Sequence, residues 1–467
     1  MAERPKFSLL GDVLAGTIMA GTSIPQLIAY AETVGYAGYR GLSTAGPNLL
    51  VWGLTTGSPW INCGVTSITA VMAKADLDGE GYVAAHGEEA YVDLVAAYSI
   101  CVGVASFLLA MGGFGSLVRR VPKPLRSGFK WGSAVGVLLA ALPNALLQKG
   151  ASTLKSIILQ NESLRTYLTS SATVLPAAGG SRTLSKALYV LTRPDLWSAI
   201  PCLLFLTCTL FVSRGKDILP RWCPPGTEVM ICTVGATLFS VYTGYEGGVV
   251  GHVPSREDGA GGTDIMGWNV PIETISVGRF MDVDLVERFG GSYAGLAISS
   301  IIFAGVNFLS IVGVASSFES ENNIPWSPTR ELTAQGLANI AAGVTGSAPV
   351  GGSLSRSLVS RMMGATSSLS SVVTAGLWIC FQNYMGLVSD TPKAALSAVI
   401  VAAVWKGVLY PKDMIAMGIG WDGAVAWGTG IGTVMTSPTV GFGIGVVLVV
   451  LVSGMKGVMV DKTEKKG

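Results

Sequence analysis

Charged residues are scarce in this sequence. Asp, Glu, Lys and Arg make up 13% of its 467 residues, whereas soluble domains carry roughly 25%. Half of the residues are hydrophobic, and the mean hydropathy is +0.53. A chain so poor in charge cannot cover a globular surface that faces water, so its apolar surplus must face lipid. We therefore expect a polytopic integral membrane protein.

The chain also lacks the motifs of several function classes. No phosphate-binding loop, GxSxG, HExxH or dinucleotide-binding fingerprint stands in a matching context, and there are two histidines. The seven cysteines show no metal-binding spacing such as CxxC and are interpreted as small packing residues. A net charge of +2 does not indicate nucleic-acid binding. We expect a non-enzyme with no catalytic residues, metal or cofactor, and no ATP-driven pumping by this chain alone.

Glycine and proline are abundant, with 61 and 21 residues. Membrane helices use both for close packing and for breaks. Several apolar runs have the length and polarity of membrane spans, and the first of them is retained because no cleavage site follows it. The fourteen predicted segments are 9–29, 41–57, 63–75, 94–113, 128–147, 195–213, 228–244, 294–316, 332–346, 353–364, 367–388, 394–410, 414–432 and 440–454.

Basic residues test this count, because Lys and Arg gather in cytoplasmic loops. With a cytoplasmic N-terminus, the loops after even-numbered spans should be basic. The loop 119–130, the pair Lys406 and Lys412, and the lysine-rich tail 461–467 fit this, whereas 76–93 holds no Lys or Arg. The pattern predicts that both termini are cytoplasmic, with the long loops 148–193 and 246–290 on the other side.

Two of the segments, 63–75 and 353–364, are unusually short. Each follows Gly and Pro, and each is third in its half of seven spans. Short, broken hydrophobic segments in matching positions indicate a transporter site built on inverted repeats, although two ordinary short helices remain an alternative. As half-helices that meet head-on, they would point free N–H groups and dipoles at one place in mid-membrane. Such a place favours an anion.

Polar side chains near these segments are candidate site residues. Arg356 would add positive charge at membrane depth, unless it snorkels to an interface. Ser353 and Ser355 could donate hydroxyl hydrogen bonds, or act as small packing residues. Gln26 follows a proline inside an apolar run, and Tyr30 shares its helical face; Tyr30 could instead belong to an interfacial aromatic belt.

Two blocks of sequence resemble the signatures of a known family. The first comprises Ile24-Pro25-Gln26, Ala29-Tyr30-Ala31, Gly35-Tyr36 and Tyr39-Arg40-Gly41-Leu42-Ser43. The second comprises Arg330-Glu331-Leu332, Gln335-Gly336-Leu337-Ala338-Asn339-Ile340, Ser353-Leu354-Ser355-Arg356-Ser357 and Gly364-Ala365. Together they resemble the sulfate permeases, the SulP family, which animals share as solute carrier family 26. The resemblance covers residues 9–455.

The resemblance implies an all-α membrane fold of about fourteen spans in two inverted seven-span repeats. Its core domain would comprise 9–113 (spans 1–4), 290–365 (span 8 to the start of span 11) and 366–388 (span 11). Its gate domain, usually the contact of a homodimer, would comprise 119–245 (spans 5–7) and 394–455 (spans 12–14). An anion would lie between the N-termini of spans 3 and 10 and move by elevator-type alternating access. The implied binding positions are Gln26, Tyr30, Val65, Thr66, Ser353, Leu354, Ser355 and Arg356.

The sequence departs from the family pattern at two points. Members usually end in a cytoplasmic STAS domain, and we expect none in a chain that stops at Gly467. Cation-coupled members resemble one another in an acidic residue of span 8, where this chain has Ser310, with Asn307 one turn earlier and no carboxylate between 301 and 317. Asn307 and Ser310 mark the possible coupling position. Exchange or uniport driven by the anion gradient is favoured over coupling to protons or sodium.

The sequence therefore predicts a secondary anion transporter, with sulfate first and bicarbonate, chloride or another oxyanion open. Alternatives are an uncoupled anion channel or voltage-responsive motor on this scaffold, a membrane-embedded enzyme, and a nucleobase carrier. The last two would need a nucleophile–base pair or carboxylates in spans 8 and 10, and neither is found. The plasma membrane is favoured over an organelle. Asn161 begins a glycosylation sequon in a loop predicted to face outside.

Overall fold

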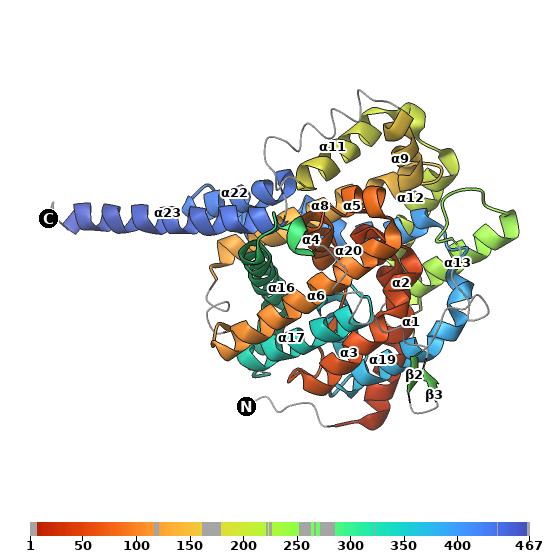
Figure 1. The fold of residues 1–467 in the computed structure, drawn as a ribbon, viewed down its shortest axis with the longest axis horizontal. Helices are drawn as coiled ribbons and strands as arrows, with labels where there is room; N and C mark the ends of the chain where they lie inside the picture. Colours follow the sequence, from red (N-terminus) through yellow and green to blue (C-terminus); the bar gives the residue numbers. More distant parts are fainter. Residues whose placement is uncertain are drawn as a thin grey trace.

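The computed structural model describes residues 7–115, 121–160, 179–220, 223, 227–251, 263–265, 268–270, 285–322, 324–436 and 438–464. Helices dominate these ranges (Figure 1). The sequon at Asn161 lies outside the described residues.

The first half of the chain folds into helices of very different lengths, as the scattered glycines and prolines require. They are α1 (Leu9–Val34), α2 (Gly38–Ser43), α3 (Ala45–Thr55), α4 (Ser67–Asp76), α5 (Gly79–His86), α6 (Glu88–Met111), α8 (Lys123–Leu146), α9 (Ala151–Gln160), α11 (Gly179–Thr192), the 3₁₀ turn η1 (Pro194–Leu196), α12 (Ala199–Ile218) and α13 (Thr227–Thr243).

The second half repeats this mixture of long and short helices. It comprises α15 (Leu285–Arg288), α16 (Tyr293–Asn322), α17 (Pro328–Val344), α18 (Leu354–Met362), α19 (Leu369–Phe381), η3 (Gln382–Val388), α20 (Lys393–Leu409), α21 (Lys412–Ala416), α22 (Trp421–Met435) and α23 (Pro438–Glu464). Four three-residue strands accompany the helices: β1 (Asn62–Gly64), β2 (Thr263–Ile265), β3 (Trp268–Val270) and β4 (Gly351–Ser353).

Each of the fourteen segments predicted from the sequence overlaps a helix of the structure. Within the described chain, five helical stretches are long and apolar enough to cross a bilayer: 9–34, 88–111, 123–146, 293–315 and 393–416. Four shorter apolar helices lie at 199–215, 227–243, 369–381 and 440–453. The first span is longer than predicted, because α1 continues through Pro25 to Val34.

The helices pack as two groups. In the first, which we call the α1 group, α17 packs on α6 and α3, and α19 packs on α3 and α1. In the second, the α8 group, α8 packs on α20 and α22, while α12 packs on α20 and α23 on α22. The groups meet where α1 contacts α20 and α13, and where α4 contacts α8. Helix α23 extends beyond the rest of the bundle (Figure 1).

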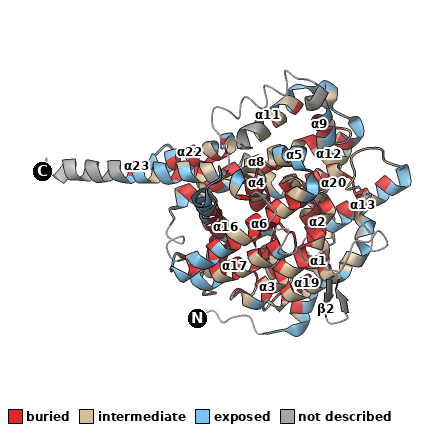
Figure 2. Ribbon diagram, viewed as in Figure 1, coloured by how far each residue is buried: buried red, intermediate tan, exposed pale blue. Residues whose placement is uncertain are grey.

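Glycines line the contact between α6 and α17. A Cβ on Gly103 would lie 2.8 Å from the backbone oxygen of Gly336, and one on Gly343 would lie 2.5 Å from that of Ala96. The two backbones therefore touch along their length, as membrane helices do when glycines line the contact. Buried residues concentrate in these central helices, and exposed apolar residues lie on outer ones such as α12, α13 and α23 (Figure 2).

A buried carboxylate ties α1 to the chain before α19. Asp12 is fully buried and accepts four hydrogen bonds, from the backbone and the hydroxyl groups of Thr366 and Ser367, at 2.5–3.1 Å. Two N–H groups ahead of a helix thus satisfy one negative charge. Because nothing in a bilayer replaces these partners, the contact fixes the start of α1 against α19.

We predict that Asp12→Ala destabilises the fold by about 3 kcal/mol, because it leaves buried donors without an acceptor. Thermal unfolding in detergent would show a lower midpoint. Asp195→Asn is the matched control: Asp195 pairs with Arg193 at an exposed position, where an ion pair contributes little. Equal midpoints for Asp12→Ala and the unmodified protein would contradict this role.

Candidate functional site

Two short strands meet in the interior and start the two shortest predicted segments. β1 pairs antiparallel with β4, with Asn62 opposite Ser353, Cys63 opposite Gly352 and Gly64 opposite Gly351. All six residues are buried. Helix α4 begins at Ser67 just after β1, and α18 begins at Leu354 directly after β4. The two segments that the sequence singled out, 63–75 and 353–364, therefore begin side by side.

The two helix starts differ in how their N–H groups are satisfied. Helix α4 has a capping box: Thr66 Oγ1 accepts from the N–H of Thr69, and Thr69 Oγ1 accepts from the N–H of Thr66. Helix α18 has Ser353 at its N-cap position, and that side chain makes no capping hydrogen bond. The start of α18 is therefore the better provided with N–H groups for a ligand.

Arg356, in the first turn of α18, is the most unusual residue of this region. Its side chain is 2% exposed. Nη2 donates to the backbone oxygen of Val65 at 3.1 Å, while Nε and Nη1 have no hydrogen-bond partner among the described residues. No carboxylate in the described part of the chain forms an ion pair with it. A buried guanidinium with unused donors is suited to an anionic partner.

The space beside Arg356 depends on a glycine. A Cβ on Gly64 would lie 3.0 Å from Nη2 and 3.2 Å from Nη1. The guanidinium thus lies against the backbone of β1, between the two strands and the two helix starts. The alternative that Arg356 snorkels to an interface is wrong, because its head group is enclosed by protein.

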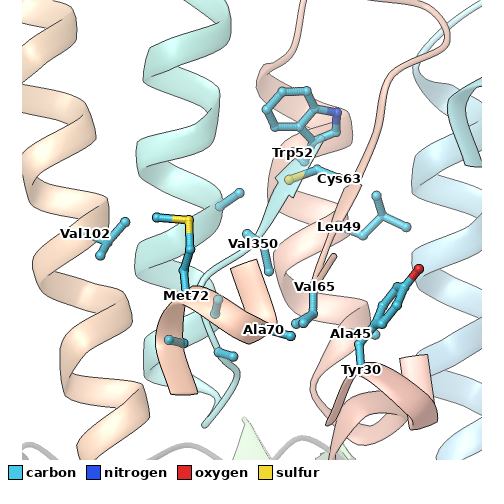
Figure 3. Close-up of a cluster of buried hydrophobic side chains, with 14 of the residues drawn as sticks. Tyr30, Ala45, Leu49, Trp52, Cys63, Val65, Ala70, Met72, Val102 and Val350 are labelled. Atoms are coloured by element: carbon cyan, nitrogen blue, oxygen red, sulfur yellow. The ribbon is translucent and has the colours of Figure 1, made fainter. Parts of the chain in front are cut away.

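Helix α1 contributes two of the sequence-predicted residues. Tyr30 is 7% exposed and lies near Ser67, at the start of α4. It lies in one buried cluster with Cys63, Val65 and Val350 (Figure 3), so an interfacial aromatic belt does not describe it. Gln26 is half-buried, and its Oε1 atom is buried without a partner.

The remaining predicted residues lie on the two short segments. Val65, Thr66 and Ser353 are buried, at 3%, 8% and 7% exposure, and Leu354 is exposed at 36%. The side chain of Ser355 lies outside the described part of the structure. Ser23 precedes Gln26 by about one turn of α1; it is 1% exposed, and its hydroxyl has no partner among the described residues.

At the possible coupling position, unlike at Arg356, the side chains are bonded to backbone oxygens. Asn307 on α16 is 1% exposed, and its Nδ2 donates to the backbone oxygen of Val350 at 2.7 Å. Ser310 donates its hydroxyl proton to the backbone oxygen of Asn307 at 2.6 Å. Both side chains are neutral and already bonded to backbone. In the described residues no group of three or more His, Cys, Asp or Glu could hold a metal ion.

Taken together, the region offers one buried cation, two helix starts and several uncharged polar groups. Such an environment can hold a small anion without a metal or a second charged side chain. Arg356, Gly64, Val65 and Ser353 come from segments almost three hundred residues apart in sequence, joined by the β1–β4 pairing.

Comparisons with known proteins agree with this chemistry. A model of the sulfate permease family matches residues 9–417. A probable sulfate transporter of Mycobacterium tuberculosis is 26% identical over 399 residues, which is 85% of this chain. The chain spans 61% of that relative's length.

Two solved structures have a similar fold. SLC26A9 superposes with a TM-score of 0.74 at 16% identity, covering 96% of this chain and 66% of that one. The transmembrane domain of the cyanobacterial bicarbonate transporter BicA gives a TM-score of 0.70 at 16% identity, covering 94% of this chain and 98% of that one. Both likenesses concern the fold.

We predict that Gly64→Ala weakens anion binding about tenfold, because the added methyl group displaces the guanidinium of Arg356 and costs it one hydrogen bond. Isothermal titration of the purified protein with chloride or sulfate would measure the loss. Gly305→Ala is the matched control, since a Cβ there meets no atom within 4 Å. Unchanged affinity in Gly64→Ala would contradict the placement of the anion beside Arg356.

Proposed function

The chain belongs to the sulfate permease family, and from that premise we propose that it is a secondary transporter that carries a small inorganic anion, first of all sulfate, across the bilayer. It is an integral membrane protein, and nothing in its family assignment indicates an enzyme. The observation that carries the proposal is the buried, unpaired guanidinium of Arg356 beside two helix starts.

The charge at the site supports sulfate as the first candidate. Helices α4 and α18 have ten and nine residues, and a helix N-terminus acts as about half a positive charge. Together with the single charge of the guanidinium, the two helix starts give the site about two positive charges. These would balance the two negative charges of a divalent oxyanion such as sulfate. Exchange of bicarbonate or chloride, or uncoupled anion flow, is the alternative that the transport test distinguishes.

The proposed binding residues are those that converge here. They are Gln26, Tyr30, Val65, Thr66, Ser353, Leu354, Ser355 and Arg356. Backbone N–H groups and hydroxyls would replace the water that the anion leaves behind, and Arg356 would balance its charge. Neutral Asn307 and Ser310 leave no carboxylate to titrate at the coupling position, so transport would follow the anion gradient.

Alternating access would use the two packing groups. The α1 group would be the core domain and carry the anion, while the α8 group would be the gate domain of a homodimer. The fourteen predicted segments would form two inverted repeats related across the β1–β4 pairing. An elevator motion of this kind must break contacts between the groups at one end and make others at the opposite end. We place both termini on the cytoplasmic side of the plasma membrane.

Several ion pairs lie at the end of the bundle where α1 stops. Lys393, at the start of α20, lies 3.0 Å from Glu32 on α1, and Asn144 of α8 donates to the same carboxylate at 3.3 Å. Nearby, Glu80 on α5 pairs with Lys74 on α4 and with Lys186 on α11. These pairs would hold that end closed.

The second of these contacts persists across the physiological pH range. Lys74 and Lys186 hold the pKa of the Glu80 carboxyl well below its ordinary value. Glu80 is therefore charged at neutral pH, and protonation would weaken the link only in acid, below the ordinary pKa of a glutamate. Because all three side chains are partly exposed, the contribution is modest.

Uptake of labelled sulfate, bicarbonate and chloride into liposomes tests the proposal. We expect saturable sulfate uptake that does not require a proton or sodium gradient, and we expect Arg356→Glu to abolish it because the variant places a negative charge in the site. Arg361→Gln is the matched control, since Arg361 lies on the same helix and donates to Asn322 outside the site.

Three outcomes would contradict parts of the proposal. Unchanged uptake in a folded Arg356→Glu protein would exclude the site. Uptake that collapses without a cation gradient would exclude the uncoupled mode. Uptake of bicarbonate or chloride in place of sulfate would show that the proposed substrate is wrong and that the protein is still an anion transporter.

We predict that Glu32→Gln favours the conformation open at the end where α1 stops. Loss of the pair, worth about 1 kcal/mol, should raise that population about fivefold. In a variant free of native cysteines, Ser23→Cys should then react about fivefold faster with an impermeant maleimide added from that side. Lys123→Gln is the control, because Lys123 pairs with Asp413 inside the α8 group. Equal rates in both variants would exclude the closing role.

A further inference from the structure

The chain between α17 and β4 crosses the interior without being helical. Residues 345–350 are buried, and Ser347, Ala348 and Val350 have no exposed surface. In the middle of a bilayer protein, each backbone N–H and C=O of such a segment needs a partner. The side chains that supply those partners fix the path by which the backbone reaches the anion site.

Val350 is the residue of this segment whose two backbone polar groups are both bonded to carboxamide side chains. Its N–H donates to Oδ1 of Asn339 at 2.9 Å. Its carbonyl oxygen accepts from Nδ2 of Asn307 at 2.7 Å and from Nδ2 of Asn339 at 3.0 Å. Two carboxamides from two different helices, α16 and α17, thus hold both polar groups of one residue.

Both carboxamides are deeply buried, and neither can reach water. Asn339 has no exposed surface and Asn307 has 1%. Asn339 also donates to the backbone oxygen of Gln335 at 2.8 Å, which orients its side chain along α17. Neighbouring points are held more simply: Tyr36 accepts from the N–H of Ala348 at 3.2 Å, and Ser99 donates to the oxygen of Ser347 at 2.8 Å.

We propose that Asn339 and Asn307 are positioning residues for the anion site, acting through Val350. The residue after Val350 is Gly351, the first of β4, and α18 starts three residues later. Fixing the Val350 peptide therefore sets the register of β4 against β1 and the direction of the α18 N-terminus. That direction determines where the guanidinium of Arg356 lies.

The amide of Asn307 suits this place better than an acid would. A carboxylate could not donate to the Val350 oxygen, and its charge would oppose an anion at the neighbouring site. The other end of the amide, Oδ1, is buried and has no hydrogen-bond partner. It faces β4, because a Cβ on Gly351 would lie 2.0 Å from it.

The experiment compares Asn339→Leu with Gln335→Leu. Both residues are fully buried amides on α17, one turn apart. Gln335 donates to Ser106 on α6 and to the backbone of Ala304 on α16. It therefore supports the packing of α17 on these helices and does not hold Val350. Sulfate, chloride and bicarbonate uptake by each full-length variant in liposomes is measured as KM and turnover, beside thermal unfolding.

We expect both variants to unfold at a lower temperature, and Asn339→Leu alone to raise KM, by about tenfold, with turnover at saturation little changed. The double variant with Asn307→Leu should raise KM less than the product of the two single effects, since both side chains act on one carbonyl. Equal KM changes in Asn339→Leu and Gln335→Leu, or none in a folded Asn339→Leu protein, would overturn the proposal.

Two further measurements keep the proposal testable if Asn339→Leu does not fold or no anion is transported. Gly351→Ala displaces the Asn307 amide without altering α17, and it should raise KM as Asn339→Leu does; an unchanged KM would count against the proposal. Hydrogen exchange requires no substrate: residues 347–357 should lose protection in Asn339→Leu and Gly351→Ala but keep it in Gln335→Leu. The KM readout rests on the proposed function. If the unmodified protein takes up none of the anions while hydrogen exchange still changes as expected, the proposed function is wrong and the positioning role stands.

Discussion

The rest of this structure depends on one backbone contact, the pairing of β1 with β4 in the interior of the bundle. Six residues without helical hydrogen bonds lie where no water is available, and each strand is the other's partner. The pairing brings two short helices to a common starting point. Arg356 is buried there and donates one hydrogen bond to the backbone of Val65.

Uncharged side chains satisfy the backbone around the β1–β4 pairing, whereas charged side chains make contacts elsewhere in the bundle. The amides of Asn339 and Asn307, with hydroxyls such as Ser99, satisfy the backbone beside the site without adding charge to it. Asp12 secures the start of α1 through Thr366 and Ser367. Glu32 and Lys393 join the two helix groups at the end where α1 stops. Because these acidic residues lie away from Arg356, its surroundings keep a net positive charge although the chain as a whole is almost neutral.

Much of the fold could be predicted because membrane helices leave a strong signal in composition. Each predicted segment overlaps a helix, and the short segments 63–75 and 353–364 stood out by their length and glycines. The first strand was hidden in Asn62-Cys63-Gly64, because three residues carry no periodicity. The extension of α1 beyond residue 29 to Val34 was also missed, although the predicted span already ran through Pro25 and Gln26.

By itself, the sequence determined the apolar surface, the short broken segments and the presence of an arginine within one of them, since each follows from residue type and spacing along one stretch of chain. The structure decided which residues meet: that Gly64 lies against Arg356, that Val350 is held by Asn307 and Asn339, and that Glu32 reaches Lys393. These contacts join residues up to several hundred positions apart. A polar side chain looks the same in a sequence whether it faces a ligand or a neighbouring peptide group, and only the packing of the helices distinguishes the two.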